Sequence, residues 1–183
     1  RVTGVQTCAL PILWTNYSQG MAAGTAGGFY DLSEHAVVSR LNGQADTALK
    51  PGMGVVQGDK PGSNVKIPAT GATLEQFEGI VINDVNREMN MDGELLIQPK
   101  TTVGVMQYGR IWVRIADGVE PKYGDPVHLI INGTGVGCFK AAADGANTLE
   151  LNARFIGGKD SSNIAPIMLY NQMHKTAAPA KSK

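Results

Sequence analysis

The sequence is short of the residues on which most catalytic and metal sites depend. Its 183 residues include three histidines and two cysteines, Cys8 and Cys138, and the cysteines do not have a metal-binding spacing. We expect only Cys138 to be native, for a reason given below, so the sequence predicts neither a disulfide framework nor an oxidising compartment. No run of about 18 apolar residues occurs, so we expect no transmembrane helix and no membrane partner.

Charge is also scarce. Charged residues make up 17% of the chain, with 16 positive and 16 negative side chains, and no basic cluster stands out. Nucleic-acid-binding proteins carry a basic patch or stripe, so we expect no nucleic-acid partner. Glycine, in contrast, is abundant at 23 residues, and the length suits one domain with tails.

No catalytic signature is found among the titratable residues. His128 lies between Val127 and Leu129 on a predicted strand, and Cys138 is expected to be a small core residue. A calcium site at residues 83–86 is conceivable, but the spacing does not match an EF-hand loop. We therefore predict no catalytic, metal or cofactor-binding residues and no enzyme. A hydrolase would require a pocket that joins Cys138 or a serine to His128.

The first twelve residues, RVTGVQTCALPI, resemble a translated sequencing adapter when back-translated from Val2. A signal peptide is the alternative, but its apolar core would be too short and is broken by Pro11. We expect residues 1–12 to be an artefact, and we leave them out of the fold.

Residues 14–30, WTNYSQGMAAGTAGGFY, are rich in glycine and alanine and show neither helical nor strand periodicity. This composition predicts an extended N-terminal arm that orders against a partner, with Tyr17, Phe29 and Tyr30 as its anchors. The alternative is a loop that packs on its own barrel.

Short strands then alternate with turn signals every 8–12 residues, which is typical of a β-barrel or sandwich. We predict an all-β, compact barrel- or sandwich-like domain, with Pro166 at an edge or at the start of a strand. A helical turn capped by Thr73 and a hairpin at Asp92-Gly93 are also expected. The predicted units are residues 13–50 (arm and first short strand), 51–172 (barrel domain) and 173–183 (disordered tail). The predicted strands are 36–41, 53–57, 65–68, 77–85, 94–98, 102–107, 110–115, 126–131, 137–142, 149–156 and 164–170.

The stretch from Val103 to Leu129 contains the clearest strand pattern. A two-residue turn at Tyr108-Gly109 would place Val105 opposite Trp112 in a hairpin. The core face of the second strand would carry Ile111, Val113 and Ile115. Its outward face carries Arg110, Trp112 and Arg114, a combination enriched in interface hot spots, and we predict a partner-binding patch there. The alternative is a solvated strand face with Trp112 covered by a loop of the same chain.

The order and spacing of several segments resemble those of the structural cement proteins of tailed phages, from about Trp14 to Tyr170. These segments are NYSQGMAAGTAGGFYDLSEHAVVSRLNGQ, LKPGMGVVQGD, FEGIVI and VGVMQYGRIWVRIADGVEPKYGDPVHLI. The resemblance implies a β-barrel-like domain with an N-terminal arm. It also implies a virion protein, made in the bacterial host cytoplasm, that binds the outside of the capsid as a local oligomer and bridges neighbouring subunits of the major capsid protein.

The alternative function is a small β-barrel that binds a ligand or carbohydrate, for example a virion adhesin. An exposed aromatic groove would favour it.

Overall fold

The computed structural model describes residues 24–83, 88–89, 91, 93 and 95–171. Within these residues the regular structure is almost entirely β-strand, as predicted. Two single-turn 3-10 helices, Leu74–Gln76 and Gly145–Asn147, are the exceptions. The strands are β1 (Ala36–Asn42), β2 (Gly54–Gln57), β3 (Asn64–Lys66), β4 (Phe77–Val81), β5 (Glu88–Met89), β6 (Leu95–Leu96), β7 (Thr102–Arg114), β8 (Pro126–Ile130), β9 (Phe139–Lys140), β10 (Thr148–Phe155) and β11 (Ile164–Leu169).

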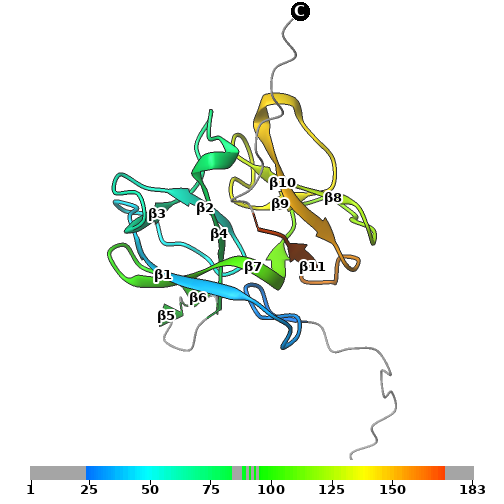
Figure 1. Cartoon of the computed structure of the whole chain (residues 1–183), viewed down its shortest axis with the longest axis horizontal. Coiled ribbons are helices and arrows are strands. Elements are labelled where there is room, and N and C mark those ends of the chain that lie inside the picture. Colours follow the sequence, from blue (N-terminus) through cyan, green and yellow to red (C-terminus); the bar gives the residue numbers. More distant parts are fainter. Residues whose placement is uncertain (1–23, 84–87, 90, 92, 94, 172–183) are drawn as a thin grey trace, which may run out of the picture.

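Nine of these strands form one sheet in the order β1-β3-β2-β4-β7-β11-β10-β8-β9. Strand β1 also pairs with β7, so the first five strands in this order close into a barrel. On the other side of β7, a bridge between Ile115 and Phe139 brings β9 back to the end of β7. Figure 1 shows β1–β4 on one side of the molecule and β8–β11 on the other, with β7 between them. The predicted all-β barrel is confirmed.

Strand β7 runs without interruption through Tyr108 and Gly109, so the predicted hairpin, with Val105 opposite Trp112, is wrong. The first half of β7 pairs with β1 and β4, and its second half pairs with β11. Gly109, with a φ of 129°, lies where the strand passes from one half of the molecule to the other. A Tyr-Gly pair lacks the Asn or Asp that favours a two-residue turn, and pairing along both halves keeps the strand extended.

The odd-numbered residues of β7 contribute to both hydrophobic cores. Val103 and Val105 are buried in the barrel. Ile111 and Val113, together with Ile115 directly after β7, are buried in the second core, which confirms the predicted core face of this segment. The barrel core also contains Leu49, Val55, Val65, Val81 and Ile97. The second, larger core includes Phe77, Ile80, Ile82, Met106, Val127, Leu129, Ile131, Phe139, Leu151, Phe155, Ile167 and Leu169.

The segment from Gly24 to Tyr30 packs along the edge of β7. Gly27 N–H donates to the Trp112 carbonyl (2.7 Å), Trp112 N–H donates to the Gly28 carbonyl (3.0 Å), and Tyr30 N–H donates to the Arg110 carbonyl (3.0 Å). This end of the predicted arm is therefore part of the domain, whereas residues 13–23 and the predicted tail at 173–183 lie outside the described residues. Strand β1, grouped with the arm in the predicted division, is a wall of the barrel.

Pro166 is the third residue of β11, which lies between β7 and β10, so its predicted position at an edge or at a strand start is wrong. The structure explains why proline is tolerated there. Trp112, its partner in β7, makes its backbone hydrogen bonds with Gly27 and Gly28 instead. On the other side, the Pro166 carbonyl accepts a hydrogen bond from the N–H of Ile156, just beyond β10 (3.0 Å), so proline lacks only the return bond at the end of this pairing.

Two of the predicted local turns lie next to the expected elements. The 3-10 turn at Leu74–Gln76 begins after Thr73, whose N–H donates to the Gln76 side chain (3.2 Å). Strands β5 and β6, which flank the predicted Asp92-Gly93 turn in the sequence, pair antiparallel, and Asp92 itself lies outside the described residues.

Candidate functional site

Three adjacent strands present a row of side chains on one face of the sheet. Arg110 in β7 lies directly opposite Met168 in β11, and Met168 lies directly opposite Arg154 in β10. Paired residues of neighbouring strands point to the same face and are separated by about 4.8 Å in backbone spacing. The two arginines thus lie on either side of a methionine, two strand spacings apart.

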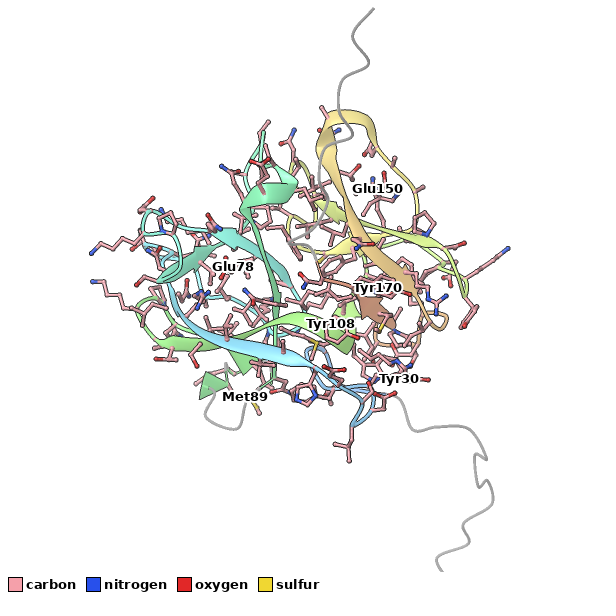
Figure 2. All side chains as sticks on the ribbon, viewed as in Figure 1. Tyr30, Glu78, Met89, Tyr108, Glu150 and Tyr170 are labelled. Carbon is pink, nitrogen blue, oxygen red and sulfur yellow. The ribbon has the colours of Figure 1, made fainter. Side chains whose placement is uncertain are left out.

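A surface hollow of about 290 Å³ lies over this row. Its walls come from the three strands, from the N-terminal segment and from the loop before β8. Figure 2 labels two of its tyrosines, Tyr30 and Tyr170. The lining includes no acidic residue, so its charged groups are both guanidinium groups. The lining residues are Tyr30, Arg110, Tyr123, Arg154, Ile156, Met168 and Tyr170.

Arg110 is held in place by an ion pair with Asp31, at 2.5 Å between Nη1 and Oδ2. Asp31 in turn accepts hydrogen bonds from the Ser33 hydroxyl and the Ser33 N–H. The bond from the Ser33 hydroxyl, followed by those from Arg110 and from the Ser33 N–H, lowers the pKa of Asp31, and the bond to Asp31 raises the pKa of Arg110. Both groups are therefore charged at neutral pH, and the charge of Arg110 is already balanced.

Arg154 is in a different situation. Its guanidinium carbon lies 6.0 Å from the centre of the Tyr123 ring, within the range of a cation–π contact. Tyr123 is 71% exposed, so this contact is made at the rim of the hollow. Among the described residues, no carboxylate is close enough to form an ion pair with Arg154. Arg154 is the source of the net positive charge of the hollow.

The predicted partner-binding patch is divided by the structure. Arg110 lines the hollow. Trp112 does not line it, but its ring lies 5.7 Å from the ring of Tyr30, which does, and Gly24 packs against Trp112 so closely that an added Cβ would come within 2.2 Å of its ring. Arg114 is engaged within the chain, because its Nε donates to the Pro51 carbonyl (2.9 Å). Trp112 and Arg114 are half-buried, whereas Arg110 is exposed.

The three predicted anchors of the arm also separate. Tyr30 lines the hollow beside Arg110. Phe29 points elsewhere, with its ring 4.8 Å from the His35 ring, and is 41% exposed. Tyr17 lies outside the described residues, so its assignment stays a prediction.

Five residues of the hollow were not singled out from the sequence: Tyr123, Arg154, Ile156, Met168 and Tyr170. A partial signal existed, because the alternation in residues 149–156 placed Arg154 on the outward face of a strand. The missing information was the strand order, which brings β10 and β11 beside β7.

The candidate catalytic residues do not line this hollow. His128 is buried on β8, opposite Glu150 and Lys140 in the neighbouring strands. Burial raises the pKa of the Cys138 thiol, which disfavours the reactive thiolate. The part of the chain that the structure describes contains no cluster of three or more side chains suited to hold a metal ion. Most of the conceivable calcium segment, residues 84–86, lies outside it. None of the described helices is long and apolar enough to cross a membrane.

Comparisons with known proteins agree with the architecture. Residues 13–170 match a family model described as "Structural cement protein (E217 gp24/Pam3 gp6)". The match begins directly after the segment predicted to be an artefact. No curated protein matches the chain. A chain of the solved structure titled "The capsid of Myoviridae Phage XM1" is similar with a TM-score of 0.66 at 18% sequence identity. The similarity covers 84% of this chain and 94% of that chain, and at this identity it shows the fold alone.

Proposed function

Since the chain belongs to the phage structural cement protein family, we propose that it binds the outer surface of a phage capsid and joins neighbouring subunits of the major capsid protein. The family makes it a structural protein of the virion that associates with capsid protein. Beyond this, we propose three things: the protein binds the outer surface of the shell, it joins neighbouring subunits, and it forms a local homo-oligomer on the shell.

The observation that carries the proposal is the family match over nearly the whole domain, including every strand of the barrel. The described structure suits the role because it is a rigid β scaffold that presents side chains on a sheet face. Arginine and tyrosine are enriched in interface hot spots, and both gather at the hollow. Nothing in the family match requires an enzymatic activity.

Among the predicted contact residues, Arg110 and Tyr30 are the ones we propose to face the partner directly, because both line the hollow. Phe29 is exposed and can add a second contact. Trp112 and Arg114 would act mainly by supporting this surface, since each is engaged by the chain itself.

The test is co-expression of residues 13–183 with the major capsid protein of the same genome, followed by gradient sedimentation. We expect the protein to migrate with assembled shells and to make them more resistant to heat, because a ligand that binds the assembled state stabilises it. Clean separation of folded protein from intact shells would contradict the proposal.

The tyrosine-lined hollow is also the feature that a carbohydrate-binding module would use. The family match favours the cement role. Glycan binding by protein that does not sediment with shells would reverse this preference.

A further inference from the structure

The hollow between β7, β10 and β11 combines tyrosine walls with a positive charge. Arg110 is neutralised by Asp31, but Arg154 has no acidic partner among the described residues. A group that enters the hollow therefore meets the Arg154 guanidinium and an apolar surface made of Met168 and Ile156. The exposed Arg154 guanidinium is therefore the cationic group of the hollow that is available to a partner of opposite charge.

We propose that the hollow binds an acidic side chain, carried by an extended segment of the major capsid protein. A carboxylate can accept two parallel hydrogen bonds from a guanidinium group, which is among the stronger polar contacts of protein interfaces. The methylene groups of the same side chain would pack on Met168 and against the tyrosine rings. The assignment rests on the proposed function and adds the site and the chemistry of its partner.

Size supports a side chain from an extended segment rather than a folded element. At about 290 Å³ the hollow has room for one or two side chains and is too small for a helix. It lies at the lower end of ordinary ligand sites, which are roughly 300–1,000 Å³. A chain that crosses the hollow could insert one acidic residue and continue over the exposed ring of Tyr123.

The hollow is also preorganised. Arg154, Met168 and Arg110 project from three hydrogen-bonded strands, and Asp31 holds Arg110 in position. The strand backbones and Arg110 are thus fixed before binding, and the side chains of Arg154 and Tyr123 are the ones left to order, so part of the contact energy remains as affinity.

The decisive measurement is the affinity of the full chain for assembled shells, compared among three proteins: the unaltered chain, Arg154→Gln and the control Lys60→Gln. Both substitutions remove one positive charge from an exposed residue, but Lys60 lies away from the hollow lining. We expect Arg154→Gln to weaken binding roughly tenfold or more. Lys60→Gln should remain within about twofold, as for an energetically neutral position. Equal melting temperatures of the three proteins verify that folding is unchanged.

Each outcome decides a separate question. If the unaltered chain does not bind shells, the proposed function itself fails. If it binds and Arg154→Gln binds equally well, only the role of the hollow fails. If both variants lose affinity to the same extent, general charge attraction explains the loss and the hollow again fails.

The occupant can be identified by placing the photo-crosslinker p-benzoylphenylalanine at position 123, whose side chain is exposed. We expect illumination of decorated shells to join it to a capsid-protein peptide that contains Asp or Glu. A cross-link exclusively to a second copy of this chain would overturn the assignment. Binding of galacturonate that depends on Arg154, without any cross-link to capsid protein, would overturn it in favour of an acidic sugar.

Discussion

Glu78 is buried in the wall of the barrel although it carries a charge, with a side-chain exposure of 7%. Its Oε1 accepts hydrogen bonds from Arg40 Nε (2.7 Å) and from Gln107 Nε2 (3.3 Å), so the group ties together β1, β4 and β7. Figure 2 shows Glu78 in the barrel half of the molecule. Glu78→Ala would leave the half-buried Arg40 without its partner, and we expect the free energy of unfolding to fall by about 3 kcal/mol in denaturant titrations.

The matched control replaces both partners, Arg40→Met together with Glu78→Leu. Replacing a buried ion pair by apolar residues of similar volume often leaves the free energy of unfolding unchanged, whereas removing one partner alone lowers it. This double variant should therefore recover most of the stability lost in Glu78→Ala. A double variant that is no more stable than Glu78→Ala would contradict the argument.

Gly79 is the residue at which the barrel wall is most tightly built. It has a φ of 145°, and an added Cβ would lie 2.3 Å from the Met106 carbonyl oxygen. Gly79→Ala must therefore both strain its own backbone and push β4 away from β7, and we expect thermal unfolding to show a loss of at least about 3 kcal/mol. Gly62→Ala is the control, because Gly62 also has a positive φ (76°) but has nothing within 4 Å of its Cβ position. Its loss should be about 1 kcal/mol, and equal losses at both positions would refute the steric explanation.

At the scale of elements, the segment 24–30 acts as an added edge of β7 rather than as a free arm. A chain that begins at Gly24 and a chain that begins at Asp31 would both retain Trp112 as their sole tryptophan, because Trp14 is removed from each. We expect the shorter chain to lose melting temperature and to show Trp112 fluorescence at longer wavelength, since it loses three hydrogen bonds to β7, a fourth from the Asn83 N–H to the Gly27 carbonyl, and the cover of the ring. Exposure of a strand edge should also promote its aggregation. Identical spectra and stabilities would mean that the segment is not part of the fold.

The strands themselves could be predicted because glycine, proline and Asp-Gly signals separate them, and such signals act over a few residues. The continuous course of β7 could not be predicted in this way. The choice between a turn and a continuous strand at Tyr108-Gly109 depends on partners from β1, β4 and β11. The same limitation applies to proline. Pro166 looked like an edge residue, and its tolerance inside the sheet depends on Trp112 bonding to a segment more than 80 residues earlier in the chain.

Prediction of the hollow likewise requires contacts between residues that are far apart in the sequence. Arg110 and Tyr30 could be selected from their residue types, but Arg154 and Met168 join them only through the strand order. Alternation along one strand indicates which side chains point outward. It does not indicate which outward side chains become neighbours.

The whole molecule offers little long-range electrostatic attraction to a partner, because its 16 positive and 16 negative side chains balance. We therefore expect local contacts, such as those proposed at the hollow, to supply its affinity for a capsid. A protein that joins two neighbouring subunits would make several such contacts at once, and the second contact would form at high effective concentration once the first is made.

A chain that joins neighbouring subunits should bind assembled capsid protein much more tightly than unassembled capsid protein. If the chain bridges neighbours, its affinity for intact shells should exceed its affinity for isolated major capsid subunits by about 100-fold, because only the shell offers both contacts together. Sedimentation with shells and with an assembly-deficient capsid variant, each titrated with the same protein, measures the ratio. Equal affinities would show that the chain decorates single subunits without joining them. Arg154→Gln should lower both affinities if the hollow contacts one subunit. The ratio of affinities therefore tests whether the chain joins neighbours, and the variant tests whether the hollow takes part in binding.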